Sequence, residues 1–282
     1  MDKPAGPTSH DVVHRARRAL GVRAVGHTGT LDPFASGLLV LLVGRATRVA
    51  RFLDGLPKTY LAVARLGLRT DTDDRTGAPL GEARSVEAVE PEAVRAGVAA
   101  MVGSRAQRPP AYSAKQVGGV RSYRRARRGE TVELPEVPVT VYGAEFRALQ
   151  GDRVTFRVTV STGTYVRALA RDLGERLGVG AHLADLRREA IGGLRVEQAL
   201  PLERLGPDTP LVPLVRVLGH LPMAALSSDE RREVQHGRAL VGRRAGGRAG
   251  SDAIALLADG AVVAIAIEQG NSLQPVVVLD SA

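Results

Sequence analysis

The segment 26–37 brings together the groups best suited to bind and transform a ligand. It reads Gly-His-Thr-Gly-Thr-Leu-Asp-Pro-Phe-Ala-Ser-Gly and stands directly before an apolar run. Glycine lets the backbone approach a ligand closely, and Asp32 adds a carboxylate at the polar end of the loop. No Gly-Lys-Ser/Thr follows, so the segment is not a Walker phosphate loop. An Asp-Pro step alone is typical of an ordinary turn, but this combination favours a functional loop.

Tyr60 and Arg167 are further candidates for a site. Tyr60 lies in an alternating run that predicts a strand, where a tyrosine usually packs in the core with its hydroxyl at the rim. Arg167 ends the segment 161–167 and falls in the first turn of a predicted helix. The helix dipole disfavours a cation there, so a buried or half-buried carboxylate would compensate. The alternative for Arg167 is a solvated arginine, one of 36 in the chain.

A dense basic run lies at 121–128. Five arginines stand within eight residues, and Glu130 is their acidic neighbour. A charge run is usually a solvated helix face, but like charges this close repel one another, which favours contact with a phosphate backbone. The sequence therefore predicts salt-dependent RNA binding through Arg121, Arg124, Arg125, Arg127 and Arg128.

The sequence offers no pattern for a metal or redox centre. It has no cysteine, which excludes disulfides, thiolate metal sites and a cysteine nucleophile. Asp71, Asp73 and Asp74 suggest calcium, but Arg75 and Thr76 stand where a calcium loop needs an acid or Asn and then Gly. The six histidines form no His-Glu-x-x-His pattern. We expect no metal.

The formal charge of +9 is unevenly distributed along the 282 residues. Residues 1–222 carry a net charge of +10, and residues 223–282 carry −1, so a polyanionic partner would meet the first part. The segment 201–222 holds five of the 16 prolines and reads as a linker. We expect one domain in 1–222, including this linker from about residue 201, and a small domain in 223–282.

No apolar run approaches the ~20 residues that a membrane helix needs. The N-terminal sequence MDKPAGPTSH lacks the apolar region of a signal peptide. Aromatic residues make up only 3% of the chain, which weighs against a sheet that stacks many bases. We expect a soluble, cytoplasmic protein.

Hydrophobic periodicity predicts the elements that must position these groups. The expected helices are 11–20 with Ser9 as cap, 48–53, 91–102 and 165–177, and the expected strands are 38–43, 60–68, 137–149 and 154–160, the last two joined at Gly151-Asp152. The tail predicts a helix after a serine cap, then strands at 254–258, 262–267 and 275–279, the first two joined by a turn at Asp259-Gly260. Hairpins beside helices predict an α+β fold with a mostly antiparallel sheet flanked by helices, followed by a small β-rich domain.

Taken in order, the motifs of residues 1–200 resemble those of the TruB-type pseudouridine synthases, which modify the TΨC loop of tRNA. The resemblance rests on Asp2-Lys3-Pro4-Ala5-Gly6, 26–37, Lys58-Thr59-Tyr60, Leu66-Gly67, Thr70-Asp71-Thr72-Asp73, 109–114, Gly163-Thr164-Tyr165-Val166-Arg167, Asp172-Leu173-Gly174, Ala181-His182-Leu183 and Leu186-Arg187-Arg188. Residues 223–282 are similar to the PUA-like RNA-binding module of some members. One departure is Lys115-Gln116, where Lys stands directly after the Tyr-Ser-Ala motif, and it affects a secondary contact only.

The resemblance implies the pseudouridine synthase fold and its reaction. The uracil N1–C1′ bond breaks, the base turns within the site, and C5 joins C1′. Asp32 matches the catalytic aspartate, whose carboxylate can attack covalently or accept a proton, and both roles stay open. Arg167 matches the arginine that pairs with it and would keep it ionised. The matches to base-binding residues are Tyr60, which stacks on the target base, Tyr165, Leu186, and His27, which occupies space in the flipped loop.

The resemblance also implies the T-arm stem-loop of tRNA as partner, with no cofactor, no obligatory protein partner and a monomeric enzyme. One alternative is a non-catalytic RNA-binding or ribosome-assembly factor with the same fold. Another is an enzyme that modifies a different RNA within a guided ribonucleoprotein. Asp32, Tyr60 and Arg167 are all present, which favours catalysis over the first alternative.

Overall fold

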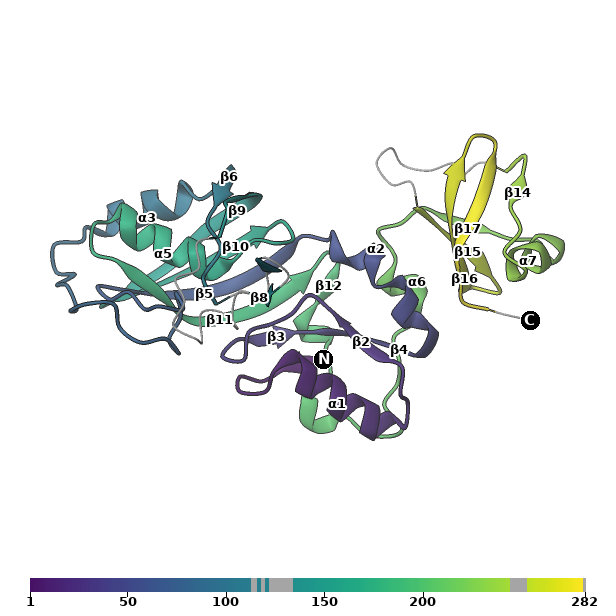
Figure 1. Cartoon of the computed structure of the whole chain (residues 1–282), viewed down its shortest axis with the longest axis horizontal. Coiled ribbons are helices and arrows are strands. Elements are labelled where there is room, and N and C mark those ends of the chain that lie inside the picture. Colours follow the sequence, from purple (N-terminus) through teal and green to yellow (C-terminus); the bar gives the residue numbers. More distant parts are fainter. Residues whose placement is uncertain (113–115, 118–119, 122–133, 244–252, 281–282) are drawn as a thin grey trace.

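The computed structural model describes residues 1–112, 116–117, 120–121, 134–243 and 253–280. Figure 1 shows a large twisted sheet with helices against it, and a separate small sheet formed by the C-terminal part of the chain. A two-stranded sheet and the first helix lie beside the large sheet. Among the described residues no helix is long and apolar enough to cross a membrane.

The large sheet has eight strands within the described residues and is mixed but mostly antiparallel. Its order is β1 (Asp2–Lys3), β3 (Ser36–Leu38), β11 (Ala181–Ile191), β5 (Lys58–Leu66), β10 (Arg153–Val160), β9 (Val137–Gln150) and β6 (Gly103–Gln107), with β12 (Leu194–Arg195) paired to β11. The pair β3–β11 is parallel, and all the other pairs in this sheet are antiparallel. The α+β fold with a mostly antiparallel sheet is therefore confirmed.

Helices α3 (Pro91–Ala99) and α5 (Val166–Arg176) pack on this sheet through one apolar core. Their buried residues Val94, Val98 and Leu169 meet Phe156 and other sheet residues in that core. Burial of such side chains contributes about 1.5–3 kcal/mol each, which holds α5 firmly against β11 and β5. The predicted helix at 165–177 and the predicted hairpin through Gly151-Asp152 are both present.

Helix α1 (Ser9–Leu20) begins at its predicted cap residue, two residues before the predicted start at Asp11. Thr8 is the cap, and it forms a capping box with Asp11. Ser9 instead exchanges two hydrogen bonds with the backbone of Leu31, through its hydroxyl, at 2.9 and 3.1 Å. The predicted cap residue thus ties the helix start to the loop that carries Asp32.

The run 38–43 is not the single strand that its apolar character predicts. β3 ends at Leu38, and β4 (Val40–Val43) pairs instead with β2 (Val25–Thr28) in a two-stranded sheet. The break falls at Leu39. Its N–H donates to the Met1 carbonyl, and its own carbonyl accepts a hydrogen bond from the terminal amine of Met1. The predicted helix at 48–53 is also divided, into a 3-10 turn over Gly44–Val49 and α2 (Arg51–Asp54).

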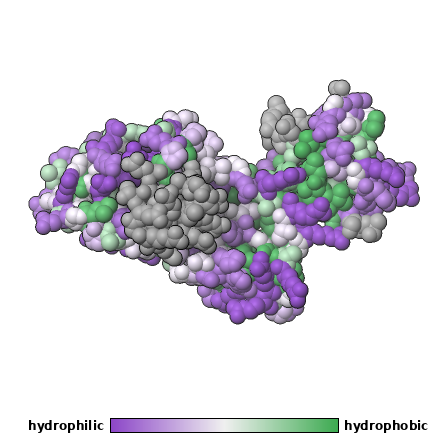
Figure 2. Space-filling model, viewed as in Figure 1, coloured by the Kyte–Doolittle hydropathy of each residue, from purple (hydrophilic) through white to green (hydrophobic). Residues whose placement is uncertain are grey.

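The C-terminal sheet has five strands within the described residues. They are β13 (Met223–Ala225), β14 (Leu240–Val241), β15 (Ala253–Ala258), β16 (Ala261–Gln269) and β17 (Ser272–Val278). Helix α7 (Ser228–Gln235) starts at a Ser227–Glu230 capping box. Asp259 and Gly260 both adopt left-handed backbone angles in the β15–β16 turn, as their Asp-Gly sequence predicts. Figure 2 shows apolar side chains over these strands, whereas α1 presents hydrophilic ones.

A second apolar core joins the two sheets. Leu53 and Leu218 pack there with Ile265 and Leu279 of the C-terminal part. Arg45 donates a hydrogen bond of 2.9 Å to the Leu279 carbonyl across this junction. The remaining short elements are β7 (Gln116–Val117), β8 (Val120–Arg121), two 3-10 turns (Val196–Gln198 and Leu202–Arg204) and α6 (Leu214–Val217).

Candidate active site

Asp32 lies in the loop between β2 and β3, at the edge of the large sheet. The loop turns at the Asp-Pro step, where the Ala35 N–H donates to the Asp32 carbonyl at 3.1 Å. Its shape depends on Gly37, which has φ +103° and lies against the backbone of Arg188; a Cβ at Gly37 would stand 2.3 Å from the Arg188 carbonyl oxygen. No other residue type fits this contact, so the glycine lets the loop that carries Asp32 lie directly on β11.

Arg167, near the start of α5, pairs with Asp32. Its Nε lies 3.0 Å from Oδ2 of Asp32, and its side chain is only 6% exposed. The carboxylate partner that the position of Arg167 in the first turn of α5 requires is therefore present. Such charge-assisted contacts are the strong ones in proteins, and this one fixes the direction of the Asp32 carboxylate.

A second carboxylate, Asp74, completes the environment of Arg167. Its Oδ2 lies 3.3 Å from Nη1 of Arg167, and its side chain is 5% exposed. The Arg167 guanidinium also donates to the carbonyls of Thr72 at 2.9 Å and Tyr112 at 3.0 Å. Sequence reasoning considered Asp74 only as a calcium ligand and missed this role. The signal available was its place in a loop rich in Asp and Thr, directly after Thr70-Asp71-Thr72-Asp73, one of the motifs that carry the resemblance.

The pKa of Asp32 is raised above its ordinary value, and burial is the main cause. Arg167 and Lys3 lower it, whereas the neighbouring charge of Asp74 raises it further. The resemblance implies that Arg167 keeps the carboxyl ionised. The arginine does lower the pKa of Asp32, but burial raises that pKa by more. The Asp32 side chain still keeps 36% of its surface exposed, so it can meet a substrate.

Three buried cations contact the loop that carries Asp32 or the segments next to it. Arg188, fully buried, donates to the carbonyls of Leu38 at 2.7 Å and Gly29 at 2.8 Å, on either side of the loop. Lys3, also fully buried, donates to three carbonyls, among them Pro33 at 3.5 Å. Lys58 packs against Gly29 and donates to carbonyls at the end of α2. The sequence motifs contained these cations but did not show that they bind backbone.

Tyr60 and Leu186 share one face of the β5–β11 pair. Tyr60 stands opposite Arg188, and Leu186 stands opposite Ala62, two residues along β5. Directly paired residues project to the same side of a sheet, so both side chains lie on the side from which Arg188 reaches the loop that carries Asp32. Both are buried in the core that also contains Leu31. The structure therefore brings these two predicted residues together with the loop.

Two further predicted residues, Tyr165 and His27, lie close in the chain to Arg167 and to the loop that carries Asp32, respectively. Tyr165 is two residues from Arg167, and its backbone is held by the buried Gln107 through bonds of 2.8 and 3.1 Å. His27 lies on β2, which leads into the loop that carries Asp32. Burial and the charge of Arg188 lower the pKa of His27, so its imidazole is neutral near pH 7. Its Nδ1 is buried and has no hydrogen-bond partner among the described residues.

The predicted RNA-backbone arginines fall where the structure gives no side-chain description. Arg124, Arg125, Arg127 and Arg128 lie outside the described residues, and only the backbone of Arg121, in β8, is described. Their role stays a prediction. In the part of the chain that is described, no group of three acidic or histidine side chains is placed to hold a metal.

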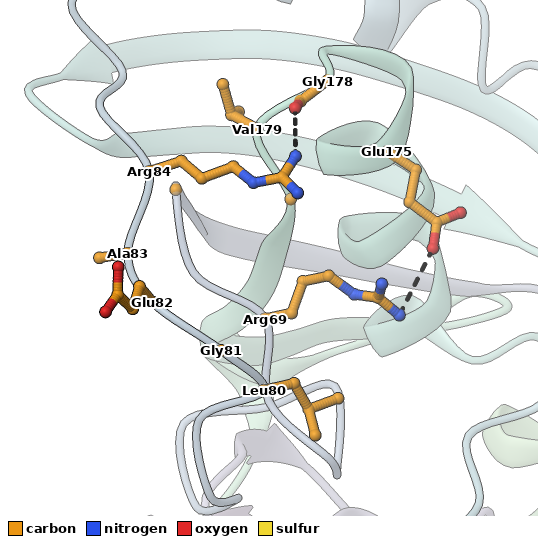
Figure 3. A pocket seen from close by; sticks show the side chains of 11 residues that line it. Arg69, Leu80, Gly81, Glu82, Ala83, Arg84, Glu175, Gly178 and Val179 are labelled. Atoms are coloured by element: carbon orange, nitrogen blue, oxygen red, sulfur yellow. Dashed lines mark hydrogen bonds and ion pairs between the residues drawn. The ribbon is translucent and has the colours of Figure 1, made fainter.

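Two surface hollows are not lined by Asp32. One, of about 620 Å³, is lined by Arg69, Arg84, Glu175 and glycines at the far ends of β5 and β11 (Figure 3). It begins at Gly67, seven residues beyond Tyr60, which is about 23 Å along an extended strand. In Figure 3 Arg84 bonds the Gly178 carbonyl and Arg69 pairs with Glu175, so both guanidinium groups are already engaged. None of the predicted site residues lines this hollow.

Comparisons with known proteins bear on what this geometry does. Residues 17–166 match a family model described as "TruB family pseudouridylate synthase (N terminal domain)", and residues 167–207 match "tRNA pseudouridylate synthase B C-terminal domain". A relative from Thermobifida fusca (strain YX), "tRNA pseudouridine synthase B", is 47% identical over 288 residues, covering 99% of this chain and 96% of the relative. The protein of the same name from Arthrobacter sp. (strain FB24) is 42% identical over 290 residues, covering 99% and 94%.

A solved structure has a similar fold. The structure titled "Crystal structure of the archaeal box H/ACA sRNP Nop10-Cbf5 complex" matches with a TM-score of 0.73 and 26% identity, covering 99% of this chain and 85% of that one. Because the first family model spans more than half of the chain and these relatives match along nearly their whole length, the chain belongs to the TruB family of pseudouridine synthases.

Proposed function

We propose that the chain converts one uridine in the T loop of tRNA to pseudouridine, acting in the cytoplasm as a monomer without an obligatory protein partner. The observation that carries the proposal is the contact between Asp32 and Arg167, set in the loop that matches the family. Nearly full-length similarity to proteins named "tRNA pseudouridine synthase B" supports tRNA as the substrate. A binding factor without activity would have no need for a carboxylate held half-exposed against a buried arginine.

The reaction is an isomerisation, and its atoms balance without a co-reactant. The bond between uracil N1 and ribose C1′ breaks, C5 bonds to C1′, the C5 proton leaves, and N1 takes up a proton. In the proposed mechanism Asp32 either bonds covalently to the nucleotide or accepts a proton from it, and each role requires the ionised carboxylate. Arg167 stabilises that ionised form through its contact of 3.0 Å.

The target base must leave the stacked loop before it reaches Asp32. Flipping a base costs a few kcal/mol, roughly the amount that one stacking contact with an aromatic ring returns. We propose that Tyr60 provides this ring, with Leu186 and Tyr165 closing the pocket. A neutral His27 would occupy the space that the flipped base leaves, since an uncharged imidazole inserts among bases at little desolvation cost.

RNA contacts outside the pocket would come from two parts of the chain. The arginines at 121–128 would neutralise phosphates, so binding would weaken as salt concentration rises. Residues 223–282 would form a PUA-like RNA-binding domain, supported by the five-stranded sheet that begins at Met223. Because this part has a net charge of −1, it would bind RNA by shape and a few placed groups.

The deciding experiment is incubation of the full chain with an unmodified tRNA transcript, followed by position-resolved mapping of pseudouridine. We expect one modified position, in the T loop, and no product when that uridine is replaced by cytidine. A transcript that is bound but never modified would overturn the proposal in favour of a binding factor. Modification that appears only after a guide RNA and partner proteins are added would favour the ribonucleoprotein alternative.

A further inference from the structure

Two arginines of α5 form a repeated pattern of contacts with one loop. Arg167 and Arg171 are four residues apart, so they lie on the same face of the helix. The loop at 70–77 presents two consecutive carboxylates to them. Asp74 lies 3.3 Å from Nη1 of Arg167, and Asp73 lies 2.9 Å from Nη1 of Arg171. The pair Asp73–Arg171 is itself largely buried, with side chains 12% and 13% exposed.

The same two arginines also hold a second segment. Nη2 of Arg167 donates to the Tyr112 carbonyl at 3.0 Å, and Nη2 of Arg171 donates to the Arg108 carbonyl at 3.1 Å. Each guanidinium therefore joins a carboxylate of the 70–77 loop to a carbonyl of the 108–112 segment. The two arginines differ in the partner of Nε, which is Asp32 for Arg167 and Asp172 of the same helix for Arg171.

The backbone of Asp73 is held in a conformation that suits this double contact. Its φ of +58° lies in the left-handed region, which Asp tolerates better than most residues do. Its carbonyl accepts the Leu183 N–H of β11 at 2.9 Å, and Asp74 bridges to the same residue. The peptide between Asp73 and Asp74 is thus fixed on one side by β11 and on the other by the two arginines.

We propose that Asp73 and Arg171 form a positioning pair for the reaction at Asp32. Their contact sets the place of the 70–77 loop on α5, the loop sets Asp74 against Arg167, and Arg167 sets the Asp32 carboxylate. The inference rests on the proposed function, since it concerns the same site. Neither residue touches the substrate in this scheme, and each acts only through Arg167.

The alternative is that the pair contributes to stability alone. The two possibilities differ in what they predict for Asp32. Arg167 lowers the pKa of Asp32, as Lys3 does, whereas Asp74 raises it. Loss of the negative charge of Asp73 would by itself lower that pKa, whereas displacement of Arg167 would raise it. A purely stabilising pair would therefore not raise the pKa of Asp32.

The test uses the full chain and a tRNA transcript, with Asp73→Asn as the variant. Asparagine keeps the shape and tolerates the left-handed backbone, but removes the charge. We expect the single-turnover rate to fall about tenfold, within the ~100-fold that a misplacement of ~1 Å can cost, while tRNA affinity stays within about twofold. The acid limb of the rate–pH profile should move to higher pH, because a displaced Arg167 lowers the Asp32 pKa less.

Asp152→Asn is the matched control, because it removes one partner of the Arg65–Asp152 pair, of similar length at 2.7 Å, in the turn between β9 and β10. If Asp73→Asn folds poorly by circular dichroism, Arg171→Lys replaces it, since one ammonium cannot hold Asp73 and the Arg108 carbonyl in the same geometry. A rate equal to that of the control, or a slower rate with an acid limb that does not move to higher pH, would overturn the proposal. An inactive wild type would instead refute the proposed function.

Discussion

The Nε of Arg167 lies 3.0 Å from Oδ2 of Asp32, and this contact joins the start of α5 to the loop between β2 and β3. The arginine is buried and the aspartate half-exposed, so the pair presents a fixed carboxylate at the surface of the site. Under the proposed function, a carboxylate held in this way needs no reorientation when the substrate binds.

Asp32→Asn should bind tRNA and lose turnover. Asparagine keeps the size of the side chain but can neither form a stable covalent bond nor accept a proton at neutral pH. We expect the single-turnover rate to fall by about 1,000-fold or more, which corresponds to about 4 kcal/mol of transition-state stabilisation. Filter binding should give a tRNA affinity close to that of the wild type. Substantial pseudouridine formation by the variant would refute the assignment of Asp32, with Asp152→Asn as the control for removal of a carboxylate elsewhere.

Tyr60→Leu should slow the reaction, whereas Tyr60→Phe should not. Tyr60 is only 7% exposed, and leucine retains much of its apolar volume while removing the ring. Stacking of a base on an aromatic side chain contributes about 1–3 kcal/mol, so we expect a loss of about 5- to 150-fold for the leucine variant. Phenylalanine keeps the ring and should stay within about threefold of the wild type if the hydroxyl does no chemistry. Equal rates for both variants would show that Tyr60 does not stack on the base.

Local sequence pattern predicts many of the helices and strands, but it does not predict contacts between residues far apart in the chain. The alternation of Val154, Phe156 and Val158 predicts β10, and the helix start at Arg167 predicts a carboxylate partner because of the dipole. Local pattern does not give the partners of Asp74 and Arg188. These partners depend on the position of the 70–77 loop and on the parallel pairing of β3 with β11. The division of the run 38–43 likewise depends on contact with the first residue of the chain, which periodicity does not record.

Lys3 should give the protein a distinctive dependence of stability on pH. Burial lowers the pKa of Lys3 from 10.5 to about 8 in the folded state. Between these values the unfolded chain holds more protons than the folded protein, so this residue makes the free energy of unfolding rise as pH increases. We expect urea unfolding from pH 7 to pH 10 to show the wild type gaining stability relative to Lys3→Met over this range. A constant difference between the two proteins would contradict the lowered pKa.

Arg167 and Asp74 should move the pH profile of the reaction in opposite directions. The pKa of Asp32 is raised mainly by burial, so the active, ionised form is lost at a higher pH than for an ordinary carboxyl. Arg167→Gln removes a positive charge that lowers this pKa, and the acid limb of the single-turnover rate should move to higher pH. Asp74→Asn removes a negative charge that raises it, and the limb should move to lower pH although the rate falls as well. Both rates are measured on a fully bound transcript, so that weaker RNA binding does not enter the profile. Displacements in the same direction would mean that the limb reports a group other than Asp32.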